Sequence, residues 1–110
     1  MSKIDLQTYN SLKESTGEDF IGELVDAFLD DAPALIAQMK SALAGKNADA
    51  FRRAAHSMKS NAATFGAMEL SALAKELESL AREKNLEVGN RVDIIEVEFQ
   101  QVKNELKSLK

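Results

Sequence analysis

His56 is the single histidine of this chain and the residue best suited to do chemistry. On a helical wheel of about 100° per residue, the apolar residues at positions 51, 55, 58, 62 and 65 form one stripe, as expected of a core-facing helix. His56 lies roughly 140° away from that stripe. The sequence therefore predicts an imidazole that faces solvent, where a neutral ring can act as a nucleophile toward a large partner.

The neighbours of His56 on the same helix face are small or basic. Lys59 lies one turn later and Arg52 one turn earlier. Ser60 and Ala63 are small, so we expect them to keep the approach to the imidazole open. The histidine is thus expected to lie between two cations, on a part of the helix surface that lacks bulky side chains.

The distribution of charged residues along this helix favours the binding of a negatively charged phosphoryl group. Positions 50–68 contain no acidic residue, although acids outnumber bases by 18 to 14 in the whole chain. Nearby positive charge disfavours the protonated imidazole, and the Lys59 ammonium is expected to contact a phosphoryl group carried by His56. Arg52 and Arg53 are expected to form a rim that attracts an acidic partner.

The histidine motif resembles the signature of histidine-containing phosphotransfer (HPt) domains. The resemblance rests on residues 56–60 (HSMKS) and 65–67 (FGA), which are similar to the pattern H-x-L-K-G followed by hydrophobic-G-A, and it extends over about residues 18–84. The chain departs from the pattern at two positions. Met58 stands in place of leucine at nearly constant volume, and Ser60 stands in place of the glycine that gives partners access to the imidazole.

The resemblance implies a phosphorelay intermediate of a two-component system. His56 is then expected to accept a phosphoryl group on Nε2 from a receiver-domain aspartate and to pass it to another receiver, while Lys59 offsets the phosphoryl charge. The implied partners are response-regulator receiver domains and a hybrid sensor kinase. Mg²⁺ is expected on the receiver, and no cofactor or metal is expected on this chain.

The composition predicts an all-α chain that forms a single domain over residues 1–110. Hydrophobic residues make up 45% of the sequence, and there is one proline. Short loops between long amphipathic segments predict an antiparallel up-down four-helix bundle, with an additional short N-terminal helix over one end. The four segments are residues 18–44, 47–65, 67–85 and 91–108.

Two local features refine this expectation. Pro33, which follows two aspartates, is expected to break the segment 18–44 and to lie in the first turn of its second piece. Gly66 follows the last apolar residue of the histidine helix, so a break or tight bend is expected there. The apolar face of the segment 18–44 is expected to include Phe20.

Several functions are excluded or disfavoured by what the sequence lacks. Without cysteine there are no disulfides or thiolate metal sites. A net charge of −4 argues against nucleic-acid binding, and no apolar run or signal peptide indicates a membrane, so a cytoplasmic protein is expected. No glycine-rich phosphate loop is present, which favours a phosphoryl carrier over an ATP-dependent enzyme. The bundle explains the apolar spacing of the last helix without a coiled-coil dimer, so a monomer is expected, and the methionine start favours a free-standing protein.

Two alternatives stay open. A non-catalytic helical adaptor or dimerisation bundle with an incidental surface histidine should bind partners equally well after His56→Gln and should carry no acid-labile phosphate. A phosphatase or pseudo-phosphotransfer module should instead remove the phosphoryl group from a receiver without taking it up. The intact His56 and Lys59 disfavour this last function.

Overall fold

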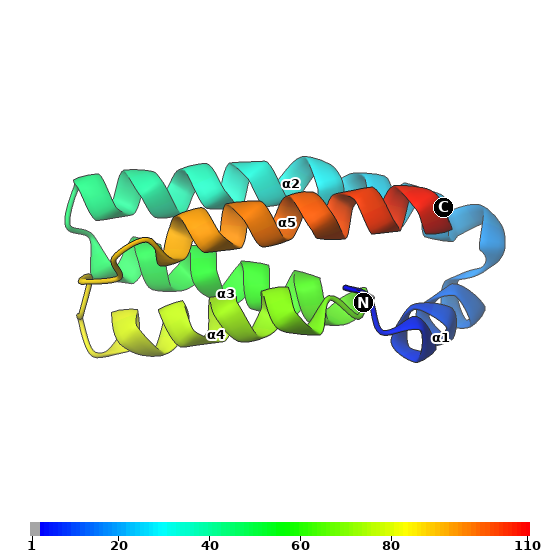
Figure 1. Ribbon diagram of the computed structural model, residues 1–110, viewed down its shortest axis with the longest axis horizontal. Helices are drawn as coiled ribbons and strands as arrows, with labels where there is room; N and C mark the ends of the chain where they lie inside the picture. The colour runs from blue at the N-terminus through cyan, green and yellow to red at the C-terminus, as the bar shows by residue number, and fades with distance from the viewer. Residues whose placement is uncertain (1–2) are drawn as a thin grey trace.

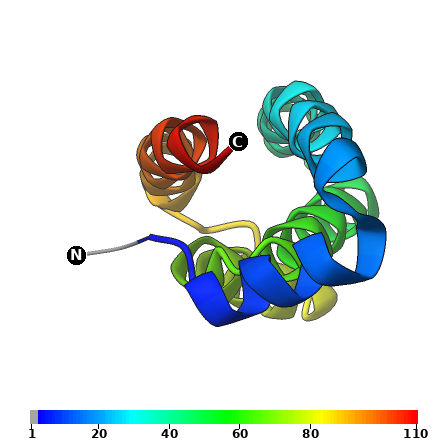
Figure 2. The ribbon, with the colours of Figure 1, turned by 90° about the vertical axis from the view of Figure 1, so that its right-hand side faces the viewer.

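The computed structural model describes residues 3–110, and these residues form five α-helices joined by short connections. The helices are α1 (Leu6–Thr16), α2 (Glu18–Ala44), α3 (Ala48–Thr64), α4 (Met68–Arg82) and α5 (Arg91–Leu109). In Figure 1, α2 to α5 run along the long axis of the molecule, and α1 lies at one end. Figure 2, seen from that end, shows α1 crossing the end of the bundle. The expected all-α bundle with a short N-terminal helix is confirmed.

The bundle is a ring of antiparallel neighbours in which α2 contacts α3, α3 contacts α4, and α5 closes the ring between α4 and α2. Each helix turns an apolar stripe inward, and the stripes form one hydrophobic core. The 27 residues of α2 span about 40 Å at 1.5 Å per residue, which accounts for the longest extent of the molecule, 42 Å. None of the helices within residues 3–110 has the length and apolarity needed to cross a bilayer.

An aromatic cluster ties the end of α3 to α2, and α2 in turn to α5. Phe28 of α2 stacks on Phe65, the residue that caps α3, at a centroid distance of 5.1 Å. The same ring meets Phe99 of α5 edge-on at 5.9 Å. All three side chains are buried. Pairs of this kind contribute about 0.5–1.5 kcal/mol beyond the area they bury, so the end of α3 is tied directly to α2 and, through Phe28, to α5 across the core.

The expected break at Pro33 is wrong, because α2 continues through this proline as one helix. Proline in a helix interior removes one backbone hydrogen bond and costs roughly 3 kcal/mol. Buried residues flank Pro33 on both sides: Ala32 precedes it, and Ile36 and Met39 follow it, each at most 4% exposed. Core packing of α2 therefore outweighs the local preference of the proline, whose own side chain is exposed.

The expected burial of Phe20 is also wrong, because this side chain is 48% exposed. Phe20 lies in the first turn of α2, directly after Gly17, which separates α2 from α1 with a φ of +96°. The next residue, Ile21, is the first of α2 to be buried. The bundle core therefore begins one residue later than the apolar pattern predicts.

The bend expected at Gly66 is confirmed, and it takes the form of a Schellman motif. Gly66 has a φ of +83°, and its N–H donates to the carbonyl of Ala63 at 3.1 Å, while the N–H of Ala67 donates to the carbonyl of Ala62 at 2.9 Å. The carbonyl of Gly66 accepts a hydrogen bond from the backbone N–H of Asp5 at 2.8 Å. This turn therefore joins α3 to α4 and also anchors the segment before α1.

We predict that Gly66→Ala lowers the free energy of unfolding by about 2–4 kcal/mol, because alanine strains the left-handed backbone. Its Cβ would also lie only 2.7 Å from the Asp5 carbonyl oxygen. Gly89→Ala is the matched control, since Gly89 has a φ of +59° but nothing within 4 Å of an added Cβ. Urea denaturation of both variants measures the difference. Equal losses would show that the contact with Asp5 carries no cost.

Candidate functional site

His56 projects from the middle of α3, as its position on the wheel predicts. Its side chain is 55% exposed, whereas the stripe on the opposite face of α3 is buried. The helix begins at a side-chain cap, because Asn47 Oδ1 accepts a hydrogen bond from the N–H of Ala50 at 3.0 Å. The exposed imidazole is therefore carried on a helix whose start and buried face are both fixed.

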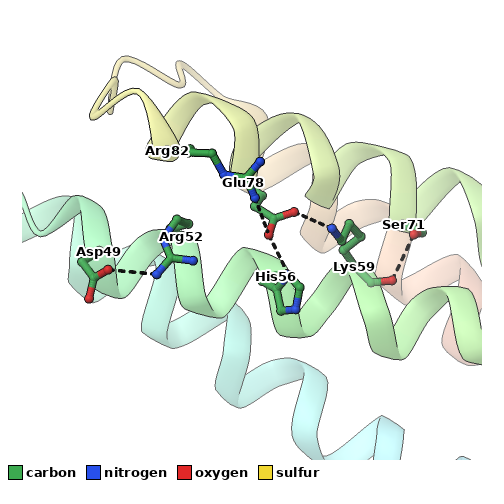
Figure 3. A network of polar contacts seen from close by, with 7 residues as sticks. All are labelled: Asp49, Arg52, His56, Lys59, Ser71, Glu78 and Arg82. Carbon is green, nitrogen blue, oxygen red and sulfur yellow. Dashed lines mark hydrogen bonds and ion pairs between the residues drawn. The ribbon is translucent and has the colours of Figure 1, made fainter.

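The imidazole is bound by a buried carboxylate that comes from the neighbouring helix. Glu78 of α4 is 3% exposed, and its Oε2 lies 2.6 Å from His56 Nδ1 while its Oε1 accepts from Lys59 Nζ at 2.6 Å. Figure 3 shows this carboxylate between the two α3 side chains, with the other ring nitrogen of His56 facing away from it. The three residues form one cluster across the α3–α4 contact.

The charge state of Glu78 determines the tautomer of His56. Burial by itself raises the pKa of the Glu78 carboxyl, but the hydrogen bonds donated by Lys59 and His56 outweigh it and bring the pKa below its ordinary value. The carboxylate is thus ionised at neutral pH and can only accept hydrogen bonds. The proton of the neutral imidazole must therefore be on Nδ1, which leaves the lone pair of Nε2 directed to the surface.

Two further contacts hold this cluster in place. Ser71 Oγ of α4 donates to the backbone carbonyl of Lys59 at 3.0 Å, which fixes α4 against α3 close to the site. Arg82, one turn after Glu78, lies 3.4 Å from Glu78 Oε2, and its side chain is 65% exposed. Glu78 is therefore surrounded by the imidazole, an ammonium and a guanidinium, of which the guanidinium is the most accessible to solvent.

Arg52 and Arg53, expected at the rim, are both held by one aspartate of their own helix. Asp49 Oδ1 lies 3.0 Å from an Arg52 nitrogen, and Asp49 Oδ2 lies 3.3 Å from Arg53 Nε. The hydrogen bond from Arg52, with the charge of Arg53, lowers the pKa of Asp49. Both cations expected beside His56 therefore have an acidic partner, because Arg52 is paired with Asp49 and Lys59 with Glu78.

The small residues around the imidazole leave one side of it open. Ser60 is exposed and Ala63 is half-buried on the turns of α3 that follow His56. A shallow groove of about 620 Å³ runs between α2 and α3 on the side away from Glu78, and it includes Arg53 and Ser57. Its other lining residues are small or polar: Gln38, Ser41, Ala42, Gly45, Asn47, Ala50 and Ala54.

The sequence interpretation missed Glu78, although α4 carries a signal for it. Positions 50–68 do lack acids, but a carboxylate reaches the histidine from a different helix. Glu78 lies four residues after Ala74 and three before Ala81, so it shares their buried face. A charged residue on an apolar stripe usually needs a buried partner. Within residues 3–110, no three His, Cys, Asp or Glu side chains gather as they would around a metal ion.

A helical bundle that presents one exposed, carboxylate-bound imidazole from its side has the features of a group carrier. Residues 23–110 match the family model of the Hpt domain, so the chain belongs to the Hpt domain family. It is a histidine phosphotransfer protein of a phosphorelay, a phosphoryl carrier rather than a kinase, and its partners include receiver domains.

A solved structure supports the same assignment. The chain is similar to histidine-containing phosphotransfer protein B (HptB) from Pseudomonas aeruginosa PAO1, with 31% identity and a TM-score of 0.88. The match covers 96% of this chain and 92% of the other. No curated protein matches this chain significantly.

We predict that the free energy of unfolding decreases less between pH 7 and pH 3 in Glu78→Gln than in the wild type. Because the pKa of Glu78 is lower in the folded protein than its usual 4.5, its ionised form stabilises the fold above that pH. This contribution is lost as the pH falls through the folded-state value. Urea unfolding from pH 7 to pH 3 should therefore show a shallower decline for Glu78→Gln than for the wild type. The exposed control Glu83→Gln should decline like the wild type; a parallel decline for Glu78→Gln would contradict the prediction.

Proposed function

We propose that His56 is the phosphoryl acceptor and donor of this protein. Nε2 attacks the phosphorus of an aspartyl phosphate on a receiver domain, the N–P bond forms, and the acyl P–O bond breaks to return the aspartate carboxylate. The reverse reaction delivers the group to another receiver. The observation that carries this proposal is the exposed imidazole whose Nδ1 is bound by Glu78 at 2.6 Å, because that contact leaves the lone pair on Nε2.

Lys59 supplies the charge that phosphoryl transfer requires. Catalysis of this reaction rests on positioning and electrostatic stabilisation, and the protein does little covalent chemistry. Lys59 Nζ lies 2.6 Å from Glu78 Oε1 and has three donor positions, so it can contact a phosphoryl oxygen one turn from His56. The exposed guanidinium of Arg82 adds a second cation on the α4 side of the site.

The receiver docks on the open side of the imidazole. Ser60 and Ala63 allow close approach, and the groove between α2 and α3 continues that surface away from α4. Arg52 and Arg53, oriented by Asp49, form the basic rim toward an acidic receiver surface. The Mg²⁺ ion needed for the aspartyl phosphate belongs to the receiver.

The wider setting follows from the same chemistry. A hybrid sensor kinase is the upstream source of the phosphoryl group. The net charge of −4 does not favour nucleic acid as a partner. We place the protein in the cytoplasm as a monomer, which exposes the whole face around His56 to receivers.

We predict that His56→Gln abolishes phosphoryl uptake. When the wild type is mixed with a receiver that carries radiolabelled phosphate, label should appear on this chain as an acid-labile, base-stable phosphate. The variant should take up no label above background, because glutamine lacks a nucleophilic ring nitrogen. Transfer that persists in His56→Gln would refute His56 as the acceptor, and unchanged receiver binding without any transfer in the wild type would support the adaptor alternative.

We predict that Lys59→Gln slows phosphoryl uptake about 10–100-fold while leaving the acceptor in place, because one charge-assisted contact to the transferring group is lost. The rate of label uptake from a phosphorylated receiver measures the effect. Lys107→Gln, an exposed lysine in the last turn of α5, is the matched control and should transfer at the wild-type rate. A Lys59→Gln rate equal to that of the control would remove Lys59 from the mechanism.

A further inference from the structure

We propose that Glu78 keeps phosphorylated His56 transferable by retaining the proton on Nδ1 at alkaline pH. This inference rests on the proposed function and extends it, since it assigns Glu78 a role in the phosphorylated state. Glu78 acts through His56 and is therefore a positioning residue. Its effect is to set the pH range over which the N–P bond can be broken.

The first step of the argument is the geometry of the contact. Glu78 Oε2 binds Nδ1 at 2.6 Å, and the carboxylate is 3% exposed. The hydrogen bond reaches the nitrogen that is not phosphorylated, so the phosphoryl group on Nε2 leaves it intact. Because the carboxylate is largely removed from water, its attraction for a positive ring is stronger than at an exposed position.

The second step is the balance of protons during transfer. With a phosphoryl group on Nε2 and a proton on Nδ1, the ring is a cation. When the N–P bond breaks, its electron pair returns to Nε2 and the ring leaves as neutral imidazole, with no proton transfer required. If Nδ1 has lost its proton first, the leaving group is the imidazolate anion, which is a far stronger base and a much poorer leaving group. The Nδ1 proton therefore determines whether the N–P bond is reactive.

The third step concerns the charges that face the ring. From α3 these are Lys59 and Arg52, and the latter is paired with Asp49. From α4 they are Glu78 and Arg82, with Lys75 three residues before Glu78 on the same helix face. Within residues 3–110, no charged side chain of α2 pairs with His56 or Glu78.

Cations in this set favour loss of the ring proton, and the carboxylate that contacts the ring opposes it. A phosphoryl group on Nε2 also changes the competition for Glu78. Its oxygens attract Lys59 and Arg82, both of which contact the carboxylate in the free protein. In the phosphorylated protein the Glu78 carboxylate then keeps His56 as its main partner. Its attraction for the Nδ1 proton therefore increases in the phosphorylated state, in which that proton determines whether the N–P bond can break.

The test uses phosphoramidate to phosphorylate the wild type, Glu78→Gln and the control Glu83→Gln. Glutamine can still accept the Nδ1 hydrogen bond but lacks the charge. Two properties are followed from pH 6 to pH 10: the ³¹P chemical shift of phosphohistidine, which reports the ring proton, and the rate of inorganic phosphate release. In Glu78→Gln both should change at a pH about one unit lower than in the wild type, which makes phosphate release about tenfold slower at the alkaline end.

The outcomes separate this inference from the proposed function. If phosphoramidate leaves the wild type without phosphate on His56, the proposed function fails. If His56 is phosphorylated but Glu78→Gln and the wild type share one pH profile, only the role of Glu78 is overturned. A merely structural role would change the release rate by the same factor at every pH and leave the ³¹P midpoint in place, which also contradicts the proposal.

Discussion

The site depends on one buried carboxylate that bridges two helices. Burying an ionised group without partners is costly, and Glu78 is buried to 3% exposure only because donors from α3 satisfy both of its oxygens. The arrangement requires α3 and α4 to approach closely. Small buried residues on the facing stripes of the two helices allow this approach: Ala55, Ala62, Ala74 and Ala81. The same contact that holds the two helices together therefore sets the tautomer of the histidine.

The register between α3 and α4 is set at some distance from the histidine. The Schellman turn at Gly66 fixes how α4 leaves α3, and the Phe28–Phe65 stack fixes the end of α3 against α2. A shift of one residue along α4 would turn Glu78 by about 100° and remove its carboxylate from His56. The turn, the aromatic cluster and the bond from Ser71 to Lys59 thus act on the site through helix register.

Local patterns in the sequence predict what lies within one helix. The exposure of His56, the buried stripe of α3 and the bend at Gly66 all follow from spacing and residue type. Pro33 was misjudged because core contacts of α2, absent from any local rule, outweigh its helix-breaking preference. Glu78 was missed because its partners come from another helix, and periodicity gives each helix a face without giving the register between faces.

The charges of the site suit a group that is both accepted and released. When the imidazole is neutral, the two positive charges of Lys59 and Arg82 and the one negative charge of Glu78 give the cluster a net charge of about +1. With phosphohistidine, the ring adds one positive charge and the phosphoryl group about two negative ones, so the cluster becomes nearly neutral. Without Glu78 the cluster would start one charge more positive and would hold the phosphoryl group more tightly. If His56 carries the phosphoryl group, as we propose, the carboxylate therefore weakens the attraction between that group and the two cations, and a carrier that passes its group on requires such a limited attraction.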